Sequence, residues 1–223
     1  MNKYLAEFIG TFFLVLTIGL TGIGAASGVI APLAIGAALM VMVYAGGHIS
    51  GAHYNPAVTI GMWIRGRLKA GDIVPYIIAQ LIGAALAAMT VNYLRAGIAV
   101  TAIAPKPGLA LLAEVLFTFA LVYVVLNSAT AEGTSGNSFY GLAIGMTVMT
   151  GAFAVGDISG GAFNPAVAVG ISILGISSWN NIWIYLVANF VGGAVAAFVF
   201  NIINPAAQVT PIATREPPYE TPQ

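Results

Sequence analysis

One stretch of the sequence occurs twice at a fixed distance, and this duplication limits the possible folds more than any other feature. HISGAHYNPAV at residues 48–58 returns as DISGGAFNPAV at residues 157–167, which places Asn55 and Asn164 109 residues apart. The same spacing relates LAIG at 33–36 to LAIG at 142–145. Self-similarity of this length predicts one structural unit that is repeated across nearly the whole chain.

Both copies are short, rich in glycine and interrupted by proline within very apolar surroundings. Asparagine favours the N-cap of a helix and proline favours the first helical position. We therefore expect Pro56 and Pro165 each to begin a short helix, with Asn55 and Asn164 at the two tips. Broken segments at matching places in two halves of a chain are typical of membrane transport sites.

The composition indicates a protein whose surface faces lipid. Of 223 residues, 59% are hydrophobic and 6% are charged, whereas a soluble domain has about 25% charged residues. Membrane lipids are therefore the expected surroundings. The net charge is zero and cysteine is absent, so no nucleic-acid partner is indicated, and disulfides, thiolate metal sites and a cysteine nucleophile are excluded.

Six apolar runs approach the length of about 20 residues that crosses a bilayer: residues 4–26, 31–48, 73–95, 109–128, 138–155 and 180–203. Each Asn-Pro-Ala segment is followed by only about nine apolar residues, too few to span. Three spanning helices per repeat is an odd number, so the second repeat is inverted and the half-helix tips meet near the midplane. We predict an all-α membrane protein with six transmembrane helices and two re-entrant half-helices.

The predicted channel domain covers residues 1–203, with inverted repeats at about 4–95 and 109–203. Residues 204–223 are polar and rich in proline, which predicts a disordered cytoplasmic tail; the third Asn-Pro-Ala, at 204–206, should only end the last helix. A cytoplasmic N-terminus places five of seven Lys and Arg residues inside. This bias favours a multi-pass protein of the cell membrane with both termini cytoplasmic.

Two acids, Glu7 and Glu114, lie at matching places in two copies of AExxxTFxLV. An acid within a membrane helix can carry protons. Alternatively, it accepts N–H bonds from the loop before each half-helix. We favour the structural role because both repeats keep the glutamate while His48 is replaced by Asp157. His48 and His53 have no third ligand nearby, so no metal site is predicted.

The half-helix tips and the loops before them are the candidate pore. Each helix N-terminus carries about half a positive charge, so two tips that meet should repel cations. The extended backbone before each tip can offer carbonyl groups to a file of solute. The predicted pore-lining loop residues are Gly51, Ala52, His53, Tyr54, Gly160, Ala162 and Phe163.

These motifs resemble the aquaporin, or major intrinsic protein, family over about residues 4–203, as a prokaryote-like member. The resemblance implies six tilted helices and two half-helices around one pore, and a homotetramer with a pore in each subunit. It also implies passage of water, or in some members of glycerol and other small neutral solutes, without a cofactor. The two NPA boxes are Asn55, Pro56, Ala57, Asn164, Pro165 and Ala166.

The resemblance further implies a constriction of four residues, which falls on Ile35, Ala152, Gly161 and Val167. Most members place arginine where this chain has Val167, and water-selective members commonly have an aromatic residue and a histidine in place of Ile35 and Ala152. The constriction should therefore be wide and apolar. Glycerol-specialised members usually carry aspartate shortly after the second box, where this chain has Ala168.

The leading hypothesis is a passive channel for water and small neutral solutes. The alternatives that stay open are a glycerol, small-solute or gas facilitator with little water selectivity, and a closed structural membrane protein. A coupled transporter would need an ion site beyond Glu7 and Glu114. No acid, base and nucleophile are grouped in the sequence, so no enzyme is predicted. An apolar constriction either conducts or dewets, and the residue types leave both outcomes open.

Overall fold

The computed structural model describes residues 1–23 and 30–205, and within them it confirms the predicted all-α membrane fold. Six helices are long and apolar enough to cross a membrane. They are α1 (Asn2–Gly22), α2 (Ile30–Ser50), α4 (Ala70–Leu94), α5 (Pro107–Thr130), α6 (Tyr140–Ser159) and α8 (Ile182–Ile203). Two helices of nine residues, α3 (Pro56–Ile64) and α7 (Pro165–Ile173), are the half-helices. Two short 3₁₀ turns, η2 (Glu132–Thr134) and η3 (Trp179–Asn181), complete the elements.

Helix ends differ from the predicted ends by a few residues. Helix α6 continues to Ser159 instead of 155, because Gly160 adopts the left-handed conformation (φ 92°) that caps a helix. Helix α8 ends at Ile203 with Asn204 as its C-cap, so the third Asn-Pro-Ala ends the last helix as predicted. The end of the first predicted run (24–26) and tail residues 206–223 lie outside the described residues.

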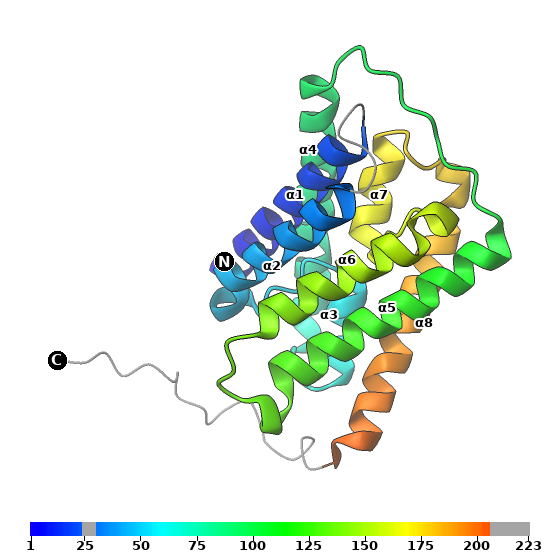
Figure 1. Cartoon of the computed structure of the whole chain (residues 1–223). Coiled ribbons are helices and arrows are strands. Elements are labelled where there is room, and N and C mark those ends of the chain that lie inside the picture. The colour runs from blue at the N-terminus through cyan, green and yellow to red at the C-terminus, as the bar shows by residue number, and fades with distance from the viewer. Residues whose placement is uncertain (24–29, 206–223) are drawn as a thin grey trace.

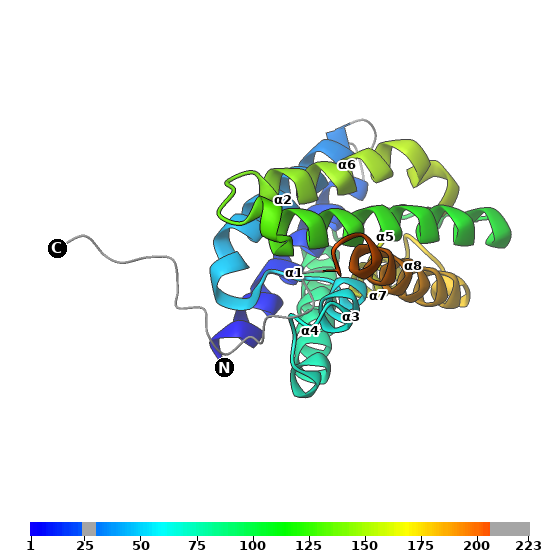
Figure 2. The ribbon, with the colours of Figure 1, turned by 90° about the horizontal axis from the view of Figure 1, so that it is seen from below.

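The helix contacts repeat between the two halves (Figures 1 and 2). Helix α1 packs along α4, and its counterpart α5 packs along α8. Helices α2 and α6 pack against each other and join the halves. Each half-helix crosses to the other repeat, α3 onto α8 and α7 onto α4. This reciprocal pairing is the arrangement that an inverted duplication requires, and it brings both half-helices to the centre of the molecule.

Glycines allow the long helices to approach closely. A Cβ atom added to Gly83 on α4 would lie 2.6 Å from the carbonyl oxygen of Phe8 on α1. The matching addition to Gly192 on α8 would lie 2.6 Å from the carbonyl oxygen of Val115 on α5. Backbones that pack this closely need small residues at the contact. Gly83 and Gly192 are therefore the small residues at these two helix crossings.

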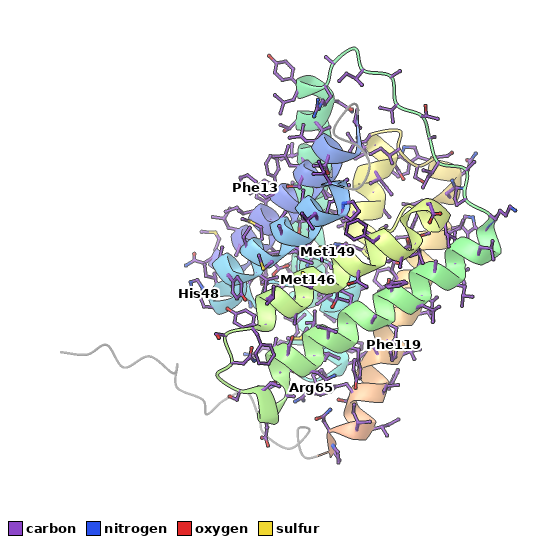
Figure 3. The ribbon with its side chains drawn as sticks, viewed as in Figure 1. Phe13, His48, Arg65, Phe119, Met146 and Met149 are labelled. Atoms are coloured by element: carbon purple, nitrogen blue, oxygen red, sulfur yellow. The ribbon has the colours of Figure 1, made fainter. Side chains whose placement is uncertain are left out.

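Large apolar side chains are exposed on the outside of the molecule, while several polar side chains are buried inside it. Phe13 on α1 and Met146 on α6 are 45% and 46% exposed, on the outer surface of the helices (Figure 3). Glu7, Gln80 and Asn189 are completely buried. A water-soluble protein rarely buries such groups while exposing large apolar ones. The distribution fits a protein in lipid whose polar groups serve an internal site.

Candidate functional site

Both half-helices begin where the sequence predicts. The Asn55 side-chain Oδ1 accepts a hydrogen bond from the Ala57 N–H at 2.8 Å, and Pro56 takes the first helical position. In the second repeat, Asn164 Oδ1 accepts from the Ala166 N–H at 2.9 Å. Each asparagine thus satisfies an N–H group that the helix leaves unpaired. The free amide end of each side chain remains available for a contact beyond its own helix.

The two tips are bonded to each other's repeat. Asn55 Nδ2 donates to the carbonyl of Phe163 at 2.9 Å, and Asn164 Nδ2 donates to the carbonyl of Tyr54 at 2.8 Å. The N-termini of α3 and α7 therefore meet, as the odd number of helices per repeat predicts. A side-chain amide has two N–H groups, so these bonds use one N–H group of each asparagine.

The loops before the tips hold an unusual backbone conformation. Ala52, Tyr54 and Phe163 have positive φ angles of 50°, 50° and 48°. Such angles are uncommon for residues with a side chain and cost of the order of 1 kcal/mol or more each. Gly161, which matches Ala52 in the repeat, has φ 61°. These loops keep their shape only if neighbouring groups hold them.

Glu7 holds the first loop. Its Oε1 accepts from Ser50 Oγ at 2.7 Å and from the His53 N–H at 2.9 Å. Its Oε2 accepts from the Tyr54 N–H at 2.6 Å and from Gln80 Nε2 at 2.8 Å. The carboxylate of a buried residue on α1 therefore fixes two consecutive backbone groups of the loop, together with the end of α2.

Glu114 on α5 holds the second loop with one partner fewer. It accepts from Ser159 Oγ at 2.7 Å, from the Ala162 N–H at 2.9 Å and from the Phe163 N–H at 2.7 Å. Asn189 takes the place of Gln80 in this repeat, but its Oδ1 accepts from Thr118 Oγ1 at 3.0 Å. The contacts of both glutamates are those that the structural hypothesis requires.

The aromatic rings of the loops pack among the helices. The ring of Tyr54 lies directly against Gly10 and Gly46, and its hydroxyl donates to the carbonyl of Met42 at 2.9 Å. The ring of Phe163 packs against Phe117, with ring centroids 5.5 Å apart. Tyr54 and Phe163 therefore anchor the loops through their rings. Their carbonyl groups each accept a hydrogen bond from the asparagine of the other repeat.

A cavity of about 70 Å³ lies where the tips meet, and it contains all four predicted constriction positions. Since about 10–15 Å³ of such volume admits one water, it can hold several. Ala52, His53, Tyr54, Gly160 and Ala162 of the predicted loops also line it. The remaining lining residues are apolar except for the two asparagines: Leu14, Ile18, Leu39, Val58, Leu121, Val125, Ile144, Val148 and Ile171.

A larger cavity of about 460 Å³ adjoins the first, and Ile144 lines both. Its wall includes Gly51, predicted as pore-lining, together with His48 and Arg67. Figure 3 labels His48 near the end of α2. The sequence did not lead us to predict the polar residues that line this cavity between the end of α5 and the start of α6. A signal was present, because residues 127–138 are polar within an apolar chain. These missed residues are Ser128, Thr130, Thr134, Ser135 and Asn137.

No group of three His, Cys, Asp or Glu side chains suited to a metal ion is found in residues 1–23 and 30–205. His53 Nδ1 lies 3.2 Å from Thr59 Oγ1, and Thr59 Oγ1 also receives Gln80 Nε2 at 3.0 Å. The imidazole therefore contacts Thr59 in the first turn of α3 while it lines the cavity. This arrangement offers hydrogen bonds to a solute and provides no ligand set for a metal.

The family model described as "Major intrinsic protein" matches residues 1–200. The chain belongs to the major intrinsic protein family. The family resemblance drawn from the two NPA boxes is thereby confirmed. The family match covers both repeats, including the two tips and the four constriction positions.

Several curated relatives match over most of the chain. One, named "Glycerol uptake facilitator protein-like 6", from Lactiplantibacillus plantarum, is 39% identical over 91% of this chain and 98% of the relative. "Aquaporin AqpM" from Methanothermobacter thermautotrophicus is 37% identical over 91% and 97% of the two chains. A solved aquaglyceroporin from Plasmodium falciparum has a TM-score of 0.78 at 24% identity, and the match covers 94% of this chain and 99% of that one. This last similarity supports the fold.

Proposed function

We propose that this major intrinsic protein is a passive channel for water and small neutral solutes. The main observation in support is that both asparagine tips and all four constriction residues line the same cavity. A larger cavity, which shares the lining residue Ile144 with the first, lies between the ends of α2, α5 and α6. Relatives named as an aquaporin and as a glycerol uptake facilitator are about equally similar to the chain, which supports a pore for both kinds of solute.

The paired tips exclude cations in this proposal. Helices α3 and α7 direct their N-termini to the same cavity, and each terminus carries about half a positive charge. The remaining N–H of each asparagine amide turns the oxygen of a passing water or alcohol toward the tips. A neutral solute therefore crosses this point with hydrogen bonds in place of its hydration shell, and a cation meets a positive potential.

The constriction selects by size more than by fixed charge. Ile35, Ala152 and Val167 offer no side-chain donor, and Gly161 leaves its backbone uncovered. A guanidinium at position 167 would supply a permanent charge and several donors. Without it, solutes with an apolar body and a few hydroxyl groups meet little penalty, so the pore should distinguish poorly between water and small polyols.

The assembly and placement of the protein follow the family. We propose a homotetramer in the cell membrane, with a separate pore in each subunit and with both chain termini in the cytoplasm. Lys3, near the N-terminus, pairs with Asp72 at the start of α4 at 2.8 Å. Arg65 and Arg67 lie in the short connection that leads from α3 to the start of α4. This clustering of basic residues supports a cytoplasmic face there.

The test is osmotic shrinkage of vesicles that contain the purified protein, followed by light scattering. With an impermeant osmolyte, shrinkage should be faster than in empty vesicles. With glycerol or urea, shrinkage should be followed by quick re-swelling. Fast shrinkage without re-swelling would contradict the broad selectivity assigned to the constriction.

A second candidate function rests on the apolar lining of the cavity. Branched aliphatic side chains surround most of it, and such a constriction can expel water and close the path. A closed structural protein or a path for apolar gases would then result. Shrinkage no faster than in empty vesicles would favour this candidate over an open channel.

A further inference from the structure

The segment that joins the two repeats reaches the constriction. Residues 95–106 connect α4 to α5, and Figure 1 shows this segment passing beside the chain that follows α7. The Ile103 N–H donates to the carbonyl of Ile176 at 2.8 Å, and Ile103 forms a parallel bridge with Ser177. The segment is therefore fixed at Ile103 to the end of the second half-helix.

The Ile103 side chain packs on the backbone of the constriction. Its Cδ1 lies 2.6 Å from the position that a Cβ of Gly160 would occupy. Gly160 and Gly161 line the pore cavity with φ angles of 92° and 61°. Ile103 thus takes the space that a side chain at Gly160 would fill, and Gly160 directly precedes Gly161 in the loop.

Hydrogen bonds connect the same place to α6 and α8. Ser177 Oγ lies 3.2 Å from the Tyr185 hydroxyl, and that hydroxyl donates to the carbonyl of Ser159 at 2.7 Å. Ser177 and Tyr185 are 1% and 0% exposed. The carbonyl of Ser159 immediately precedes Gly160, so the inter-repeat segment, α8 and the end of α6 converge on the glycines.

The first repeat shows no such connection within its described residues, 4–23 and 30–95. Tyr76 matches Tyr185 and likewise donates to the carbonyl of Ser50, at 2.8 Å. However, Leu68 stands at the place of Ser177, and the atom nearest to a Cβ of Gly51 is Nε2 of its own loop residue, His53, at 3.2 Å. The additional support is therefore specific to the repeat that contributes Gly161 and Val167 to the constriction.

We propose that Ile103 is a specificity-determining residue that sets the width of the pore at Gly160 and Gly161. It is a positioning residue, because it acts through the glycine backbone. With valine at position 167, none of the described residues that line the cavity is Lys, Arg, Asp or Glu, and the packing of Ile103 holds this backbone. The inference rests on the proposed channel function. It adds a contributor to selectivity besides the asparagine tips and the four constriction residues, and this contributor lies in the segment between the two repeats.

The test compares the permeability of vesicles to water, glycerol and the larger polyol erythritol. Ile103→Ala removes the cover from Gly160, so the glycerol-to-water and erythritol-to-water ratios should rise severalfold. Ile98→Ala is the matched control, because Ile98 is an exposed residue (40%) of the same segment. Ile103→Leu keeps an apolar side chain of equal volume and should restore ratios close to those of the original protein.

The outcomes separate this inference from the function on which it rests. A conducting protein whose ratios are the same with Ile103→Ala as with Ile98→Ala would overturn the role of Ile103 and leave the channel intact. An equal fall in all three permeabilities would indicate general damage and would also overturn it. An original protein that conducts neither water nor glycerol would overturn the channel function and this inference together.

Discussion

Replacing Glu7 by glutamine tests whether one carboxylate organises the first pore loop. Each oxygen of Glu7 accepts a backbone N–H, from His53 on Oε1 and from Tyr54 on Oε2. Whichever way the glutamine amide is placed, its NH₂ group faces one of these N–H donors. The substitution therefore breaks the backbone hydrogen bond on that oxygen and disturbs the Ser50 or Gln80 contact that shares it. It also changes the other acceptor from charged to neutral, with almost no change in volume.

The expected loss follows from these contacts. A hydrogen bond to a charged group contributes about 1.5–3 kcal/mol. Counting the two backbone bonds alone, one lost and one weakened give a destabilisation of about 2–4 kcal/mol. For a chain of this length that corresponds to a fall in Tm of roughly 4–16 °C. Water permeability should fall as well, because Ala52 and Tyr54 leave their strained conformation when the loop is released.

Thermal unfolding of the detergent-solubilised protein and vesicle shrinkage measure the two effects. Gln80→Asn is the matched control, since the second repeat has asparagine at that place and Glu114 keeps its loop contacts without it. This control removes one side-chain partner of Glu7 and should cost under about 2 kcal/mol, with permeability retained. A Glu7→Gln protein as stable and as permeable as the original would refute the account of the loop.

The other predictions concern the constriction, the tips and a helix crossing. Val167→Arg adds a fixed charge and donors at the constriction, so the glycerol-to-water permeability ratio should fall; an unchanged ratio would show that position 167 does not face the solute. Asn55→Asp combined with Asn164→Asp lowers the potential at the tips, so vesicle conductance should reveal a cation leak, and unaltered ion exclusion would count against the half-helix charges. Gly83→Ala places a Cβ 2.6 Å from a backbone oxygen and should lower the free energy of unfolding by about 1–3 kcal/mol, measured by thermal unfolding. The control is Gly108→Ala, where a Cβ meets nothing within 4 Å and the change should be neutral or stabilising. Equal effects of the two substitutions would contradict the close crossing of α1 and α4.

Most of the fold could be predicted from the sequence because its signals are local and duplicated. Asn-Pro at each tip determines where a helix begins, and the apolar lengths show which helices span. The family resemblance implied the four constriction positions, and the shared spacing from Gly36 to Asn55 and from Gly145 to Asn164 supported their register; all four line one cavity. The end of α6 was misplaced because Gly160 caps the helix through its conformation, a property that residue type alone does not reveal.

The remaining features depend on contacts between distant segments. Gln80 and Asn189 occupy matching places, but one methylene group decides whether the amide reaches the glutamate. Ile103 is one of several apolar residues in a short connection, where no periodic pattern marks it. The large adjoining cavity is formed by the ends of α2, α5 and α6 together. Such features require the positions of side chains that are far apart in the sequence.

The most direct test of the channel account measures solute entry and ion leak in the same vesicles. Vesicles that contain the protein and an internal pH-sensitive dye are mixed with glycerol across a proton gradient. The account predicts shrinkage, then re-swelling much faster than in empty vesicles, while the dye responds no faster than in empty vesicles. Re-swelling at the rate of empty vesicles would contradict an open pore for neutral solutes, and rapid re-swelling with a collapsing proton gradient would contradict exclusion at the paired tips.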